Sequence, residues 1–230
     1  MKSTNLPLVL PDWLHGALSA LRRRARGEAA LDLTGDRDVE WSWVAAHLNQ
    51  GPGAALDFGT GGSALGLIAA ERGYEVTAVD LGAVEWPYVH ERLSFLRGDI
   101  FALPLPRDHF DLVLNCSSVE HVGLVGRYGI STPRSDGDLD AMTRLRELMK
   151  PRATMLLTVP VGRDTVFAPL HRVYGAERLP RLLTGFTVVS RELWLKRDDR
   201  RWTPVAEQDA LAYEPRERLY GIGCFELRRP

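Results

Sequence analysis

A glycine-rich segment, Leu56-Asp-Phe-Gly-Thr-Gly-Gly-Ser63, constrains the fold more than any other feature of the chain. A short apolar run, residues 54–58, leads into it, and an apolar pattern of helical spacing, residues 63–72, follows it. Glycines at such a junction let the backbone turn sharply and approach a ligand closely. In an open parallel sheet, the ligand crevice lies at the carboxyl ends of the strands. The segment therefore predicts a strand, a ligand-binding loop and a helix, in that order.

Short apolar runs alternate with helical patterns after this segment, which is typical of a parallel sheet with crossover helices. The predicted strands are 54–58, 75–80, 94–97, 110–115 and 154–160, and the predicted helices are 63–72, a short one near Val119, and 138–149. The link from Asp80 to Ser94 is short and contains Pro87, so a full crossover helix does not fit there. Two later strands, 185–195 and 221–229, are expected to pair antiparallel, with residues 197–216 as an exposed loop between them.

The first fifty residues show two helical patterns, one around Leu14, Leu18 and Leu21 and one from Trp41 to Leu48. We expect residues 1–50 to form a helical cap packed on a domain of residues 51–230, with one structural domain overall. The arginine run 22–26 is interpreted as a solvated helix face. The net charge of −1 gives no reason to expect a nucleic-acid partner.

No apolar stretch approaches the ~20 residues that a membrane helix needs, so no membrane partner is expected. Two distant cysteines without metal-ligand spacing favour a reducing, cytoplasmic setting. A small-molecule substrate and a monomer or homodimer complete the predictions for the partners.

Three aspartates at successive strand ends decide between two possible ligands of the glycine loop. The spacing of Gly59, Gly61 and Ala64 also satisfies a dinucleotide fingerprint, with Asp80 placed for a ribose. However, Asp57 would repel a pyrophosphate and would attract the cationic methionine moiety of S-adenosylmethionine (SAM). Asp80 can accept both ribose hydroxyls, and Asp99 can accept an adenine amino group beside an apolar residue, Ile100. The set favours SAM, and a nicotinamide-dependent oxidoreductase stays as the alternative, although no Tyr-x-x-x-Lys pair is evident.

The segment from Asp57 to Ser63 resembles the acidic-x-Gly-x-Gly-x-Gly motif of class I SAM-dependent methyltransferases, with Ser63 in place of the third glycine. This resemblance, over roughly residues 50–195, implies an α/β Rossmann-like fold with six parallel strands and an antiparallel seventh. The implied cofactor-binding residues are Asp57, Gly59, Thr60, Gly61, Asp80, Leu81, Asp99, Ile100, Asn115 and Cys116. A second resemblance, to a small methyltransferase-like family catalogued as a domain of unknown function, is carried by five motifs. They are residues 115–123, 127–129, 136–138, 159–164 and 171–175.

Two histidines are the candidate bases for the proton that a hydroxyl acceptor loses on O-methylation. His121 follows the fourth strand, beside the expected methyl position, and His171 follows the fifth. Residues predicted to contact an acceptor, such as a sugar-like or specialised metabolite, are Glu120, Arg127, Tyr128, Arg172 and Tyr174. Arg127 and Tyr128 lie in a glycine-punctuated loop that could form a lid.

Two further alternatives concern the same residues. Glu120, His121 and His171 also fit part of a divalent-cation pattern, but Ser117 stands where that pattern has a carboxylate, so no metal is predicted. A non-catalytic SAM-binding protein on the same scaffold is the remaining alternative.

Overall fold

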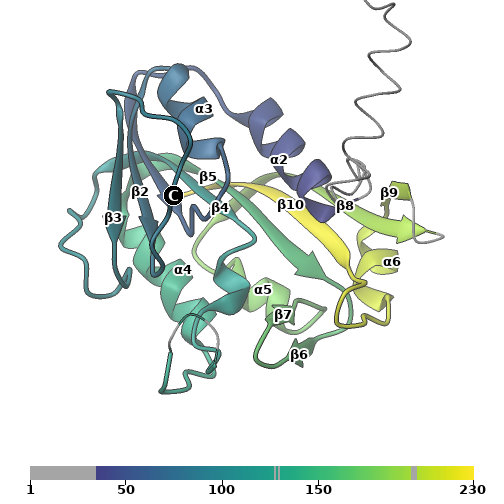
Figure 1. Cartoon of the computed structure of the whole chain (residues 1–230). Coiled ribbons are helices and arrows are strands. Elements are labelled where there is room, and N and C mark those ends of the chain that lie inside the picture. Colours follow the sequence, from purple (N-terminus) through teal and green to yellow (C-terminus); the bar gives the residue numbers. More distant parts are fainter. Residues whose placement is uncertain (1–34, 127, 129, 198–200) are drawn as a thin grey trace, which may run out of the picture. The chain divides into compact units, whose positions relative to one another are not determined.

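The computed structural model describes residues 35–126, 128, 130–197 and 201–230 (Figure 1). Within it, Asp36–Pro230 form one compact unit. The predicted helix around Leu14 and the arginine run 22–26 lie outside the described residues. The second predicted helix is present as α2 (Asp36–His47), and it belongs to this compact unit.

One large sheet organises the unit and confirms the predicted α/β fold. Its strands run in the order β3-β2-β1-β4-β5-β10-β8-β9. Their bounds are β1 Gly53–Phe58, β2 Tyr74–Asp80, β3 Leu93–Arg97, β4 Phe110–Cys116, β5 Met149–Val161, β8 Thr187–Arg197, β9 Arg201–Val205 and β10 Gly221–Arg228. Strands β3, β2, β1, β4 and β5 pair in parallel, whereas β10 pairs antiparallel with both β5 and β8, as the two long terminal strands predicted.

The predicted exposed loop, residues 197–216, is where the fold differs most from expectation. It contains β9, which pairs antiparallel with β8 and makes the sheet eight-stranded rather than seven-stranded. It also contains α6 (Glu207–Ala212), whose Ala210 is fully buried. Charge and proline concealed this strand because β9 is an edge strand, where exposed charges and a proline are tolerated.

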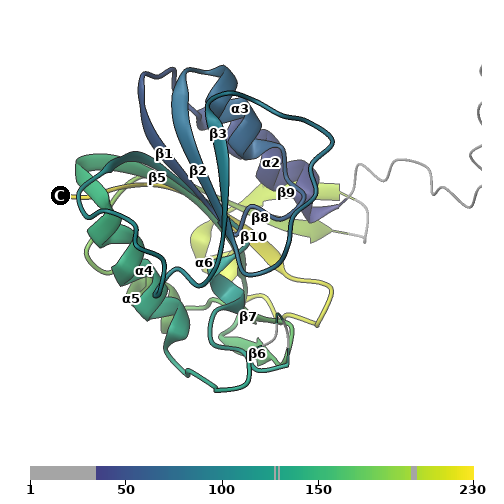
Figure 2. The same cartoon turned by 60° about the vertical axis from the view of Figure 1, so that its left-hand side comes forward.

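Helices cover both faces of the sheet, which therefore has two apolar cores (Figures 1 and 2). On one face α2 and α3 (Leu65–Glu71) bury Trp43, Val44 and Leu65. On the other face α4 (Gly137–Leu148) and α5 (Arg178–Leu182) bury residues such as Leu145 and Leu179. Burial on both faces explains the nearly continuous apolar runs of the central strands.

Two connections matter for the site. The link between β2 and β3 has no helix, as its short length and Pro87 predicted. A short helix, η1 (Val119–His121), follows β4, and a small hairpin, β6 (Thr165–Phe167) with β7 (His171–Val173), follows β5. Among the described residues, no helix is both long and apolar enough to cross a membrane.

Candidate functional site

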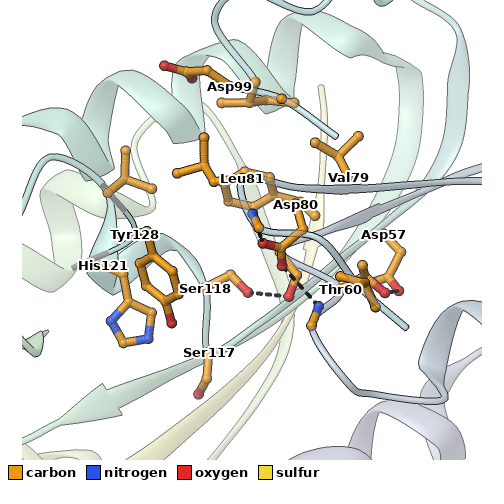
Figure 3. A pocket seen from close by; sticks show the side chains of 18 of the residues that line it. Asp57, Thr60, Val79, Asp80, Leu81, Asp99, Ser117, Ser118, His121 and Tyr128 are labelled. Atoms are coloured by element: carbon orange, nitrogen blue, oxygen red, sulfur yellow. Dashed lines mark hydrogen bonds between the residues drawn. The ribbon is translucent and has the colours of Figure 1, made fainter. Parts of the chain in front are cut away.

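A cavity of about 1030 Å³ opens at the carboxyl ends of β1, β2, β3 and β4 (Figure 3). Its volume is at the upper end of the range for small-molecule pockets, so it has room for a cofactor with an acceptor beside it. Eleven of the predicted site residues line it, namely Asp57, Gly59, Thr60, Gly61, Asp80, Leu81, Asp99, Ile100, Cys116, His121 and Tyr128. Residues that are far apart in the sequence thus meet at one sheet edge.

The glycine loop is held from several sides. Gly59 has φ +69° and Gly61 has φ +48°, a backbone region that suits glycine. The Gly59 N–H donates to the Val79 carbonyl at 2.8 Å, and the Ser118 hydroxyl donates to the Gly59 carbonyl at 3.1 Å. From the β2–β3 link, the Trp86 indole N–H donates to the Gly61 carbonyl at 3.2 Å. These hydrogen bonds fix the conformation of the loop.

Replacing Gly59 with alanine tests the role of this conformation. A Cβ there would overlap the Ser118 side chain, in a left-handed conformation that costs an L-residue about 1–2 kcal/mol. We expect Gly59→Ala to weaken binding of S-adenosylhomocysteine (SAH) by about tenfold or more, as measured by calorimetry. Gly62→Ala is the matched control, because a Cβ there meets nothing within 4 Å and no left-handed φ is required. Equal effects of the two changes would contradict this account of the loop.

Asp57 lies beneath the loop and braces it. Its carboxylate accepts a hydrogen bond from the Thr60 hydroxyl at 2.7 Å and another from the Gly66 N–H at the start of α3. Burial raises the pKa of Asp57 to about 6, and these two hydrogen bonds oppose the shift. Its carboxylate is part of the cavity wall, and a direct contact with the methionine ammonium stays a prediction.

Asp80 and Asp99 line the part of the cavity predicted for adenosine. Asp80 accepts the Gly61 N–H at 3.0 Å and the Gly82 N–H at 2.8 Å, so its position at the end of β2 is fixed. Asp99 is exposed and accepts the Phe101 N–H at 3.0 Å. Ile100 and Phe101 supply apolar surface beside them. Carboxylates flanked by apolar side chains suit an adenosine, which carries hydroxyl and amino donors on a flat apolar ring.

Two aromatic residues of the β2–β3 link contact the glycine loop. Trp86 bonds the Gly61 carbonyl, and the Tyr88 hydroxyl donates to the Ser63 carbonyl at 2.7 Å. Neither side chain lines the cavity. Both therefore stabilise the loop from outside, and Ser63, at the third glycine position, is part of that contact.

His121 and Tyr128 form the wall opposite Asp57 and Thr60 (Figure 3). The His121 Nδ1 lies 2.6 Å from the Leu170 carbonyl, and the Nε2 lies 3.6 Å from Glu120 Oε1. Because a carbonyl only accepts, Nδ1 carries the hydrogen, and Nε2 of the neutral ring has a lone pair. The Tyr128 ring lies 5.7 Å from the imidazole, in the segment where Gly123 and Gly126 have positive φ.

Helix α2 contributes a group of polar residues that the sequence reading missed. Glu40 is 1% exposed, and its carboxylate accepts hydrogen bonds from Ser117, from the Thr158 hydroxyl at 2.9 Å and from Arg37 at 3.1 Å. Ser117, which follows β4, has φ +45° and lines the cavity together with Arg37. The only available sequence signal was a charged residue one helical turn before Val44, on the buried face of the helix.

Five predicted site residues do not line the cavity, namely Asn115, Glu120, His171, Arg172 and Tyr174, and Arg127 lies outside the described residues. Arg172 is 2% exposed and donates to the carbonyls of Glu120, Val122, Arg134 and Ser135. The Tyr174 hydroxyl donates to Asp138 at 3.1 Å. These contacts give both side chains a structural role, which corrects their expected role in holding an acceptor.

The other three residues lie behind the cavity wall. The His171 ring packs against Phe167 and Tyr220, and the second candidate base does not line the cavity. Asn115 is fully buried beside Met142, on the α4 side of β4. Glu120 is buried behind His121. The described part of the chain contains no group of three His, Cys, Asp or Glu side chains that could hold a metal ion.

Two family models match parts of the chain. Residues 56–132 match the model described as a methyltransferase domain. Residues 104–198 match the model described as Caenorhabditis protein of unknown function, DUF268. The first match covers the glycine loop, the three aspartates and His121, and the second begins before β4 and ends after β8. No curated protein sequence matches the chain.

Solved structures with the same fold cover almost the whole chain at low identity. The 1,6-didemethyltoxoflavin-N1-methyltransferase of Burkholderia thailandensis, solved with 1,6-didemethyltoxoflavin and SAH, is 20% identical, with a TM-score of 0.60 over 98% of this chain and 93% of that chain. The [4+2]-cyclase SpnF is 16% identical, with a TM-score of 0.61 over 95% and 94%. A putative methyltransferase of Bacillus halodurans is 15% identical, with a TM-score of 0.59 over 84% and 99%.

The sheet order, the glycine loop and the methyltransferase-domain match agree with one another and with the motif resemblance. They favour SAM over a nicotinamide dinucleotide as the ligand of this loop. The chain therefore contains a class I methyltransferase domain with S-adenosylmethionine as its cofactor, and its central part resembles a family described only as a protein of unknown function.

Proposed function

We propose that the protein transfers the methyl group of SAM to a hydroxyl of a small molecule, of the sugar-like or specialised-metabolite kind, with His121 as the general base. The observation that carries this proposal is the orientation of His121. Its Nδ1–H is held by the Leu170 carbonyl, in the wall of the same cavity as the glycine loop. The proposal assigns the proton-accepting role to the other ring nitrogen, Nε2.

Methyl transfer to oxygen needs alignment of the acceptor and removal of its proton. When bound, SAM supplies an electrophilic methyl group on a sulfonium. The chain supplies the rest. The loop and the two aspartates orient the adenosyl end, His121 Nε2 accepts the hydroxyl proton, and Tyr128 and Ile130 line the wall beside it. The resulting imidazolium loses its proton to solvent after the reaction.

The proposed acceptor atom is oxygen, although the named relative from Burkholderia methylates a nitrogen. A nitrogen acceptor that carries a hydrogen also releases a proton, so the role of His121 would be similar. The fold is shared by proteins with different activities, since the [4+2]-cyclase SpnF has it as well. Identification of the methylated product is therefore the measurement that tests both methyl transfer and the acceptor atom.

Two measurements test the proposal in sequence. Calorimetry with SAM, SAH and NAD should show binding of the first two only. Incubation of a fractionated metabolite pool with methyl-labelled SAM should then produce a labelled product whose mass exceeds that of its precursor by one methylene unit. Tight SAH binding without any labelled product would favour a non-catalytic SAM-binding protein. A product labelled on nitrogen would correct the acceptor atom.

A further inference from the structure

Behind His121 lies a buried carboxyl group that the proposed reaction has not yet used. Glu120 is 2% exposed and does not line the cavity, and its Oε1 lies 3.6 Å from the His121 Nε2. Its Oε2 is buried and has no hydrogen-bond partner among the described residues. Such a group in the interior calls for a physical explanation, because an unpaired carboxylate there is strongly disfavoured.

A second buried carboxyl, Glu40, forms the direct ion pair with Arg37. Glu40 accepts hydrogen bonds from Arg37, Ser117 and Thr158, which suits an ionised carboxylate. Arg37 interacts electrostatically with both carboxyl groups, and like charges disfavour each other's ionised form. The ionised member should be the better-partnered one. Glu120, which has fewer such contacts, then keeps its proton beside His121 Nε2.

We propose that Glu120 and His121 act as one proton-accepting pair, in which the Glu120 carboxyl holds a proton at rest and, once ionised, stabilises the imidazolium that His121 becomes. This inference rests on the proposed function and makes Glu120 a positioning residue. When the pair has lost its resting proton, the acceptor O–H bond breaks and its proton forms an N–H bond at Nε2. The oxygen would keep the electron pair with which it attacks the methyl carbon, and the electron pair of the broken carbon–sulfur bond would leave with SAH. The positive charge on the ring then faces the Glu120 carboxylate.

The charged surroundings of Glu120 support this order of ionisation. Burial raises the pKa of Glu120 to about 8, and Glu40 adds to the shift, while its own N–H, Arg37 and Ser117 oppose it. Burial also raises the pKa of Glu40, where the charge of Arg37 and the hydrogen bonds from Ser117 and Thr158 oppose the shift. The titratable and charged groups around it are Arg37 and Glu40 of α2, Cys116 of β4, His121 of η1, Arg172 and Tyr174 beside β7, Asp138 of α4, and Tyr220 before β10.

Infrared difference spectroscopy of the SAH complex tests the resting state without any acceptor. We expect the carbonyl band of a protonated carboxylic acid at neutral pH, a loss of this band as the pH rises through about 8, and its absence in Glu120→Gln. Glu147→Gln is the control, because Glu147 is an α4 carboxylate in ion pairs with Arg107 and Arg144. A wild-type spectrum without the band at neutral pH would overturn the inference.

Should Glu120→Gln fold poorly, nitrogen NMR of the His121 ring in the unaltered protein asks the same question. We expect a neutral ring near pH 7, with the hydrogen on Nδ1. An imidazolium at that pH would mean that Glu120 is already ionised, and it would equally overturn the proposal. Both spectroscopic results are independent of methyl transfer, so they can fail while the proposed function stands.

The pH profile of turnover then separates a positioning role from a merely structural one. In the unaltered protein, kcat should rise through about pH 8 as the pair loses its resting proton. In Glu120→Gln the imidazole titrates alone, so the rising limb should move down toward the ordinary histidine pKa of about 6.5, with a lower plateau. A structural defect would lower the maximal kcat without shifting the pH at which kcat rises, and that outcome would also contradict the proposal.

Discussion

His121→Gln is expected to lower kcat by roughly 10²- to 10⁴-fold, which is the range that a positioned general base contributes. Glutamine keeps a neutral polar side chain of similar length, but its amide nitrogen lies at the level of Nε2 rather than of Nδ1, which is the atom that contacts the Leu170 carbonyl. It has no nitrogen that accepts a proton near neutral pH. SAH binding should stay within about threefold of the unaltered protein, because the loop and Asp80 hold that ligand from the other wall. Turnover of the acceptor found with labelled SAM, together with calorimetry, provides both measurements.

Two other histidines make this expectation specific. His109 is exposed and packs on Phe110, away from the cavity, so His109→Gln should leave kcat unchanged. His171 was the second candidate base, and its ring packs on Tyr220 rather than in the cavity wall. If His171→Gln abolished turnover in a folded protein while His121→Gln did not, the assignment of the base to His121 would be wrong.

Asp138→Ala is expected to lower the free energy of unfolding by about 3–5 kcal/mol, the range for breaking a buried ion pair on one side. Asp138 is fully buried in the first turn of α4. It accepts from the Tyr174 hydroxyl at 3.1 Å and from Arg178 Nε at 2.8 Å, and Arg172 lies 3.7 Å away. Without the Asp138 carboxylate, the guanidinium of Arg172, which is 2% exposed, loses its counter-charge.

Asp136→Ala is the matched control in the same segment. Asp136 is half-exposed and pairs with Arg178 and Arg181, and exposed pairs of this kind contribute about 0–1 kcal/mol. Urea denaturation of both variants measures the two free energies of unfolding. Equal losses, or a loss below about 1 kcal/mol for Asp138→Ala, would contradict the structural role given to this buried network.

Arg172 belongs to this buried network, although its position in the sequence predicted that it would bind the acceptor. It follows β5 in a motif rich in polar residues, and chain position alone places it near the crevice. In the structure, β7 turns the side chain inward, where it donates to carbonyls on both sides of the segment after η1. Sequence position predicts which end of a sheet a residue is near, but not whether its side chain points into the cavity or behind it.

Local patterns in the sequence determined the strand–loop–helix unit at Asp57–Ser63, the strands of the parallel sheet and the missing crossover helix before β3. These features depend on glycine and proline geometry and on apolar periodicity, which operate within a few residues. The three aspartates at the strand ends were predictable for the same reason, because parallel strands end at one edge.

Only the tertiary structure decided the other half of the site. It brought Glu40 from α2 to Ser117, 77 positions further along the chain, and it placed Glu120 behind the wall that His121 forms. Long-range packing sets which carboxyl group receives the guanidinium of Arg37 and which one is buried without it. The type of ligand could therefore be read from local spacing. The side chains that handle the acceptor's proton could not, because burial and charge pairing depend on segments that meet only in the folded chain.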